Sequence, residues 1–440
     1  MYQLKFTLKQ HTPIIHFQHD QVGATLRATE VKPKLDRFIL MKLGNGNYEL
    51  GRETAKNNGW LIDKDKGALD YKMRINPIGP QMHTELINLS EGVDRQNRPK
   101  LNSNSLGGYF GNMMKVEEFQ AGKPYKKVSF YETIDLMLSS GNQSLIEKIR
   151  VVINEFFFKT NFSTRQSKGF GGFYPLNEIN TIERAWYYKN FEINASDFKQ
   201  LFYKLELFYK LLRSGINLKG NGGRDLFYAK SLLFCYMKTT HVQWEKKTIK
   251  ESWFNTDRTR RDGSIVFEGL ESQIERRELG QNDQSGFSSQ NKKVIKDILG
   301  LSSDEAWLSY QKAMITKEHV QQNGREFPEN SIDKIERYMS PILFKILHVS
   351  ENKYKIYVIV NDSDAIKDKK IKFTWDRNSF SLDTANYSVV DFLRWICNSS
   401  NLNFSNHVSQ NMHSATIQNR DLGTISLFNT LNDIINQLQS

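Results

Sequence analysis

Three glycines, two cations and two phenylalanines lie within the segment RQSKGFGGF, namely Arg165, Lys168, Gly169, Phe170, Gly171, Gly172 and Phe173. The glycines let the backbone approach a ligand closely, and the cations attract phosphate groups. The aromatic rings offer faces on which unpaired bases can stack. These are the parts of a loop that grips single-stranded RNA. A glycine turn with both phenylalanines in the core explains the same residues without a ligand.

Other glycine, cysteine and histidine patterns exclude several common functions. The glycine-rich segment has no glycine at the sixth position of a dinucleotide fingerprint, and it lacks the Lys-Ser/Thr ending of a phosphate-binding loop. Cys235 and Cys397 form no CxxC pair, which argues against a zinc ribbon or a disulfide framework and fits a reducing, cytoplasmic setting. His16 and His19 would point to opposite faces of a strand. We therefore expect no metal site and no cofactor.

The charge of the chain favours a polyanionic partner. The 440 residues include 61 Lys and Arg against 49 Asp and Glu, so the formal net charge is +12. Hydrophobic residues make up 39% of the chain, which is enough to build the cores of two or three domains. No apolar stretch approaches the roughly 18 residues of a membrane span, and the first residues lack the apolar centre of a signal peptide.

The sequence before the glycine-rich segment predicts the elements that position it. Tyr2–Ile15 alternates apolar and polar residues as a half-buried strand does, and Pro33 suits the first turn of a helix. Leu69–Ile75 and Lys127–Leu138 predict two further strands, the second with β-branched and aromatic residues. Leu145–Phe158 has its apolar residues at helical spacing.

A short strand after the glycines would complete the order βαββαβ over residues 1–192. This order predicts a ferredoxin-like (RRM-like) domain, in which an antiparallel sheet carries two helices. The glycine-rich segment would then connect the second helix to the last strand, at one edge of the fold.

Residues 193–440 predict a helical middle region followed by a second, degenerate ferredoxin-like domain. Phe198–Leu212 and Leu226–Met237 have the pattern of two helices, joined by a glycine-containing turn. Pro341–Val349 and Lys353–Val360 predict a hairpin. Helices over Val389–Cys397 and Ile425–Leu438 would complete the second domain. The fold class is therefore α+β.

Several segments together resemble the RAMP superfamily of CRISPR-associated proteins. They are the predicted strand end TPIIHF, the run GATLRATEVKPKLDRF at the first helix, the long second helix and RQSKGFGGF. In that superfamily a glycine-rich loop of this type follows the second helix of a ferredoxin-like domain. Arg337–Ile346, RYMSPILFKI, is similar to a segment in the later part of the first subunit of the Cmr module, a RAMP protein with two such domains. The resemblance therefore covers both halves of the chain.

This resemblance implies a structural subunit of a type III-B CRISPR ribonucleoprotein, which acts in antiviral defence. Its partners would be the 3′ part of the guide RNA, the target RNA and other RAMP subunits of the Cmr complex. No catalytic role is expected. A guide must be held regardless of its sequence, so contacts to the RNA backbone should outnumber contacts to base edges.

The resemblance also assigns residues to RNA. It places the RNA backbone against the glycine-rich segment with Arg165 and Lys168, and against cations around the first helix. Those cations are Arg27, Lys32, Lys34 and Arg37. Lys219 and Arg224 in the second glycine-containing segment would add phosphate contacts, although a plain interhelical turn explains them equally well. A solvated helix face explains Lys34 nearly as well as RNA contact does.

Two other functions compete with this one. Some members of the superfamily cleave RNA through a histidine or through an aspartate after the first strand, where His16, His19 and Asp20 stand. In that case the chain is an endoribonuclease with Asp20 and His16 as catalytic residues. A turn at Asp20 with ordinary strand-end histidines is the simpler explanation. The third possibility is a protein-interaction scaffold that binds no nucleic acid, its charge serving solubility or an acidic partner.

Overall fold

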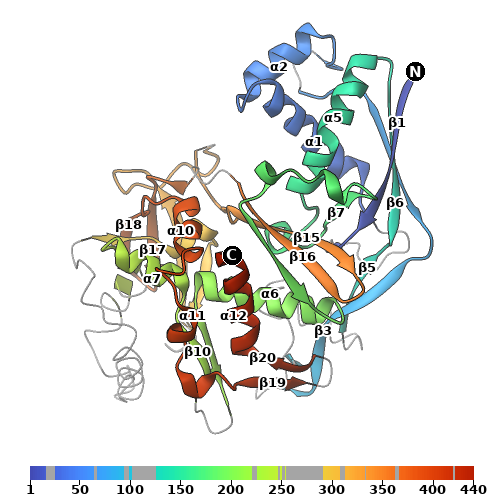
Figure 1. Cartoon of the computed structure of the whole chain (residues 1–440). Coiled ribbons are helices and arrows are strands. Elements are labelled where there is room, and N and C mark those ends of the chain that lie inside the picture. The colour runs from blue at the N-terminus through green and yellow to red at the C-terminus, as the bar shows by residue number, and fades with distance from the viewer. Residues whose placement is uncertain are drawn as a thin grey trace. The chain divides into compact units, whose positions relative to one another are not determined.

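The computed structural model divides the chain into two compact units (Figure 1). The first comprises Met1–Glu206, Leu343–Ile359 and Asn419–Leu422, and the second comprises the remaining segments. The structure describes residues 1–15, 25–63, 67–93, 99–101, 125–220, 225–245, 248–249, 253, 291–307, 313–331, 333–361, 366–419 and 422–440. No helix in these described ranges is long and apolar enough to cross a membrane.

The first unit contains three sheets and the longest helices of the described chain. Its strands are β1 (Tyr2–Gln10), β2 (Lys72–Ile78), β3 (Met82–Val93), β4 (Pro99–Leu101), β5 (Tyr125–Phe130), β6 (Thr133–Ser140), β7 (Phe173–Pro175), β8 (Lys189–Asn194), β15 (Ile342–Ser350) and β16 (Lys353–Val360). Its helices are α1 (Ala28–Leu43), α2 (Tyr48–Asn57) and α5 (Gln143–Lys159). Helix α6 (Phe198–Arg213) spans the boundary in sequence between the two units.

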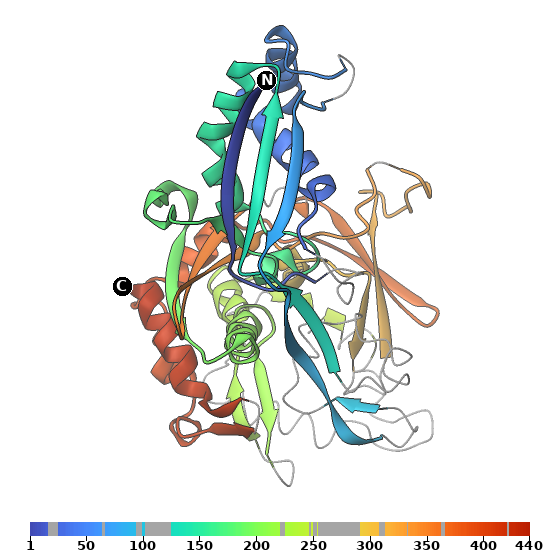
Figure 2. The same ribbon diagram turned by 90° about the vertical axis from the view of Figure 1, so that its right-hand side faces the viewer.

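The main sheet of the first unit has the spatial order β2-β6-β1-β7, and all neighbours are antiparallel. Along the chain its elements follow β1, α1, β2, β6, α5 and β7. The last strand thus lies beside the first. Figure 2 shows β1, β6 and β2 edge to edge, with the helices behind them on one face.

The sequence pattern explains these elements. Leu4 and Leu8 of β1 point into the core, while the residues between them are more exposed. Helix α5 begins after Asn142, whose side chain accepts a hydrogen bond from the Leu145 N–H. Its apolar residues at three- and four-residue spacing, including Ile149 and Phe156, are buried against the sheet and α1. The strand and helix predicted here are confirmed, although β1 ends at Gln10.

Other predicted boundaries change. Helix α1 starts at Ala28, so Pro33 lies inside the helix and not in its first turn. The single strand predicted over Lys127–Leu138 is two strands, β5 and β6. The hairpin predicted in the second domain is present as β15 and β16, but β16 pairs with β8 of the first unit. This sheet, β15-β16-β8, therefore extends the first unit with residues that lie far away in the sequence.

The second unit also combines sheets and helices. Its strands are β9 (Ile216–Lys219), β10 (Asp225–Ala229), β11 (Gln243–Trp244), β12 (Lys292–Lys293), β13 (Asp304–Trp307), β14 (Ala313–Val320), β17 (Lys370–Trp375), β18 (Asn378–Asp383), β19 (Thr416–Asn419) and β20 (Gly423–Ser426). Its helices are α7 (Leu232–Thr239), α10 (Val389–Ile396), α11 (Phe404–His407) and α12 (Leu427–Gln439). The helices predicted at α10 and α12 are confirmed, whereas the helix predicted over Leu226–Met237 is strand β10 followed by α7.

The largest described sheet of this unit has the order β13-β14-β17-β18, so its strands lie in their order along the chain, although β15 and β16 intervene in sequence between β14 and β17. A ferredoxin-like sheet places its first strand between the last and the third, so this meander differs from the expected second copy of that fold. The overall class is α+β in both units.

Candidate nucleic-acid interface

The glycine-rich segment forms a tight turn between α5 and β7. Arg165 has φ +60°, Gln166–Lys168 form one 3-10 turn, and Gly169 and Gly171 have φ +90° and +68°. Side chains rarely adopt this left-handed region. At Gly171 a Cβ atom would also lie 2.0 Å from the carbonyl oxygen of Phe162. The glycines are therefore required by the fold of the loop itself.

The chain just after β1 holds this loop in place. The Gly171 N–H donates to the Pro13 oxygen at 2.8 Å, and the His11 N–H donates to the Gly172 oxygen at 2.8 Å. The fully buried Thr12 hydroxyl donates to the Gly169 oxygen and accepts from the Gly172 N–H, both at 2.8 Å. The loop amides predicted to bind phosphate are thus partly used within the protein.

Both phenylalanines of the loop are fully buried. Phe170 stacks on Phe202 of α6 with a centroid distance of 3.8 Å and an interplanar angle of 7°. Phe173 belongs to the core of the first unit, where it packs against Phe162. The prediction that these two rings stack on RNA bases is wrong for this arrangement, because neither ring has an exposed face. Gly169, Gly171 and Gly172 are buried as well.

A buried lysine from a distant strand ties the loop to the end of α5. Lys345 of β15 is fully buried, and its ammonium donates to the oxygens of Phe157 (2.6 Å), Thr160 (3.0 Å) and Phe173 (2.9 Å) and to Asn161 Oδ1 (3.2 Å). The carbonyls at a helix C-terminus lack partners within the helix, so this contact caps α5. Burial lowers the pKa of Lys345 well below its usual value.

Sequence analysis missed Thr12 and Lys345 as loop-positioning residues. A signal for Lys345 was present, because it is the one charged residue within the apolar run ILFKILHV. If such a strand lies in the core, its charged side chain must have polar partners, because burial without them is costly. No comparable signal marks Thr12.

Two of the four cations predicted around α1 are half-buried and bonded to other groups of the protein. Lys32 forms a salt bridge with Asp36 at 2.8 Å and donates to the Leu69 oxygen at 2.9 Å. Lys34 reaches Glu30 (3.3 Å), the Asn161 oxygen (3.4 Å) and Gln166 Oε1 (3.1 Å). Burial lowers the pKa of Lys34, and Glu30 offsets part of this effect. Both lysines join α1 to neighbouring segments.

The remaining predicted cations of the first unit face outward to different degrees. Arg27, which precedes α1, and Arg37 are exposed, and Arg37 lies over the Tyr48 ring with 5.5 Å to the centroid. Arg165 and Lys168 are half-buried at the loop surface, beside the exposed Thr164. The Ser163 N–H donates to Glu30 Oε1 at 2.5 Å, so this part of the loop adjoins the first turn of α1.

Several predicted residues lie outside the part of the chain described. These are His16, His19, Asp20 and Arg224, together with the side chain of Lys219. Within the described residues, no group of three or more His, Cys, Asp or Glu could hold a metal ion.

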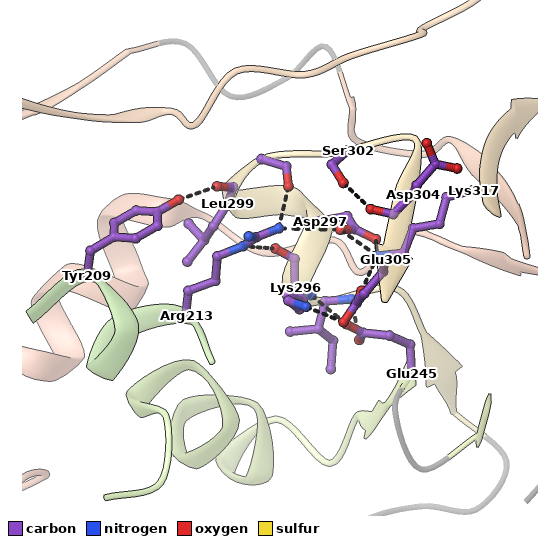
Figure 3. Close-up of polar contacts among 12 residues, drawn as sticks. Tyr209, Arg213, Glu245, Lys296, Asp297, Leu299, Ser302, Asp304, Glu305 and Lys317 are labelled. Carbon is purple, nitrogen blue, oxygen red and sulfur yellow. Dashed lines mark hydrogen bonds and ion pairs between the residues drawn. The ribbon is translucent and has the colours of Figure 1, made fainter. Parts of the chain in front are cut away.

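The second unit has a cluster of buried charges, which we call the Lys317 cluster (Figure 3). Its members are Arg213, Glu245, Lys296, Asp297, Glu305 and Lys317. The Lys317 ammonium donates to Asp297 Oδ2 at 2.9 Å and to Glu305 Oε2 at 2.6 Å. Burial acts to lower the pKa of Lys317, but these two carboxylates raise it above its usual value.

The other members of the Lys317 cluster complete the charge balance. Arg213 lies 3.5 Å from Asp297 and donates to the Gly300 oxygen at 2.6 Å. The Glu245 carboxylate accepts the N–H groups of Ile295 and Lys296 at 2.9 and 3.1 Å, and burial raises its pKa. Three cations therefore face three carboxylates. This arrangement of charges links α6, β13 and β14.

Comparisons with known proteins agree with the resemblance found in the sequence. The family model "Cmr1 N-terminal domain" matches residues 1–216, and "Cmr1 C-terminal domain" matches residues 228–420. A search of curated proteins found no match. Among solved structures, the apo crystal structure of Cmr1 from Pyrococcus furiosus matches this chain with 11% sequence identity and a TM-score of 0.31. The match covers 89% of this chain and 93% of that chain. Since the two family matches leave only residues 217–227 and 421–440 uncovered, the chain belongs to the Cmr1 family of type III-B CRISPR proteins.

Proposed function

We propose that this chain is an RNA-binding structural subunit of a Cmr ribonucleoprotein and contacts the 3′ part of the guide RNA, the target RNA or both. Membership of the Cmr1 family supports a place in the Cmr complex beside other Cmr proteins. The net charge of +12 suits an RNA partner. The first unit has the strand order and helix placement of a ferredoxin-like domain, and we infer that it is one.

The observation that carries this proposal is the division of the glycine-rich loop into two parts. Residues 169–173 are buried and fixed by hydrogen bonds, whereas residues 164–168 lie at the surface and include Arg165 and Lys168. A rigid base keeps the cations of the outer part in place at little entropic cost on binding. The exposed Arg27 extends this surface at the start of α1. The glycines and phenylalanines thus support the contact and do not make it.

A charge-reversal pair tests the proposal. We expect Arg165→Glu with Lys168→Glu to weaken binding of a labelled single-stranded RNA by about tenfold, because two attractive charges become repulsive. The measurement is fluorescence anisotropy of the full chain at several salt concentrations. The thermal transition should change little, since both side chains are only half-buried at the loop surface.

The matched control is Lys56→Glu with Arg150→Glu. These two exposed cations lie on α2 and α5, and the double variant changes the net charge by the same amount. Its RNA affinity should fall no more than about threefold through the general field of the protein. Equal losses in the two double variants would show that the loop has no specific role in binding. A large loss of thermal stability in the loop variant would show that the two cations are structural.

A further inference from the structure

The outward face of β1, β6 and β2 is a second basic surface of the first unit. Helices α1 and α5 cover the opposite face of the sheet, as Figure 2 shows. We call this surface the open sheet face, made by the side chains that alternate with the core residues along these three strands. It carries Lys5, Lys9, Lys72 and Arg74. Asp135 is the only acidic residue among the described residues of these strands.

The strand register arranges these cations on both sides of the central strand. Lys5 lies opposite Met137 of β6, and Met137 lies opposite Arg74 of β2. Because neighbouring strands are about 4.8 Å apart, the backbones at Lys5 and Arg74 are separated by about 10 Å. Lys72 lies one outward position from Arg74, at about 7 Å along the strand. The outward side chains of β6 are therefore mostly neutral, and the cations lie on the two neighbouring strands, β1 and β2.

Protection of a sheet edge accounts for only part of this pattern. Cations on an edge strand often prevent pairing with another sheet, and β2 is such an edge. Strand β1 pairs with β6 along its length and with β7 only at Leu8–Gln10, so Lys9 protects no open edge. Within the described chain none of the four cations has an ion-pair partner, and Arg74 donates to the neutral Asn76 side chain at 3.2 Å. Lys5, Lys72 and Arg74 are thus exposed and Lys9 is half-buried, with a single carboxylate among them.

We propose that the open sheet face binds the ribose–phosphate backbone of a single-stranded RNA that runs along β6. The excess of positive charge complements a polyanion. Among the described outward residues of the three strands there is no aromatic ring, so the bases find no stacking platform and binding is independent of sequence. This inference rests on the proposed function in naming RNA as the partner, but it uses residues that the glycine-rich loop does not contain.

The test measures binding of a labelled single-stranded RNA of mixed sequence to the full chain with Lys5→Glu and Arg74→Glu. We expect at least a tenfold loss of affinity at moderate salt. The slope of log affinity against log salt should fall by about 1.4, since each phosphate contact with a single strand contributes about 0.7. The Lys56→Glu with Arg150→Glu variant again controls for net charge. Lys5→Gln with Arg74→Gln repeats the test with a smaller perturbation if the charge-reversed chain folds poorly.

The outcomes separate this inference from the proposed function. If the sheet variants bind RNA as the control does while Arg165→Glu with Lys168→Glu binds weakly, the open sheet face is not an RNA surface and the loop proposal stands. If the sheet variants keep RNA affinity but fail to join the other Cmr proteins, the face binds protein and the inference is overturned. If the sheet variants lose affinity and the loop variant does not, RNA lies on the sheet alone.

Discussion

At the scale of single residues, the glycine-rich loop is determined by backbone conformation and close contacts. Gly171 and Gly59 have nearly equal φ angles, +68° and +66°, but only Gly171 has backbone atoms within reach of a Cβ. The pair therefore separates the cost of a left-handed conformation from the cost of a steric clash.

We predict that Gly171→Ala destabilises the protein by about 3 kcal/mol or more, because the Phe162 carbonyl must move. Gly59→Ala should cost about 1 kcal/mol, the price of the left-handed conformation alone. Chemical denaturation of both variants measures the difference. Similar losses in the two variants would mean that the loop relaxes easily and is not rigid.

The buried His11 gives a second prediction. Burial lowers the pKa of His11 well below 6.5, and the charges of Lys345, Lys9 and His348 lower it further. The folded chain therefore keeps His11 neutral where the unfolded chain takes up a proton. The contribution of neutral His11 to the free energy of unfolding is fully present above pH 6.5. It decreases as the pH falls below 6.5, by up to about 1.4 kcal/mol per pH unit.

Thermal unfolding between pH 7.5 and 5.5 checks this prediction against His11→Asn. The Asn side-chain oxygen can accept the His348 N–H that His11 Nδ1 accepts at 2.9 Å. The variant should lose less stability on acidification than the native chain. His319 and His407 of the second unit also have lowered pKa values. Their contribution to the pH dependence of stability is therefore the same in the native chain and in the variant. An unchanged pH dependence would contradict the role given to His11.

Single residues also show where sequence reasoning reaches its limit. The motif RQSKGFGGF predicted a functional loop, but not that Phe170 would stack on Phe202, because that partner lies on a later helix. Whether a phenylalanine after a glycine faces the core or solvent depends on tertiary packing, which spacing does not record. The charges of Lys32 and Lys34 were visible, but their salt bridges and carbonyl partners were not.

At the scale of elements, local patterns predicted the strongly periodic ones. Helix α5 has both an N-cap and a full apolar face, so its prediction is correct within two residues. The apolar run Leu226–Met237 predicted one helix, but it is divided between β10 and α7. Short apolar runs fit a buried strand and a buried helix equally well.

The C-terminus of α5 is held by Lys345 of another element, β15. Lys345→Met should destabilise the protein by about 3 kcal/mol or more, since the variant leaves buried carbonyl oxygens without donors. Denaturant unfolding measures the loss. Lys353→Met is the matched control on the same hairpin, because its salt bridge with Glu192 is exposed and should contribute less than about 1 kcal/mol. Equal effects would show that Lys345 does not hold α5 and the loop together.

At the scale of the whole molecule, the family could be predicted from short segments, but the division into units could not. The hairpin β15–β16 follows more than 140 residues after β8, its partner in the sheet. Such distant pairing leaves no local signal, so the hairpin was assigned to the second domain. The second unit, with its meander and its Lys317 cluster, likewise follows contacts that periodicity does not reveal.

The central claim is that the first unit holds RNA through its outer loop and its open sheet face. Photocrosslinking of 4-thiouridine RNA within the assembled Cmr complex, followed by mass spectrometry of the linked peptides, tests it most directly. We expect crosslinks to residues 164–168 and to β1, β2 and β6. Crosslinks confined to the second unit, or none to this chain, would contradict the account.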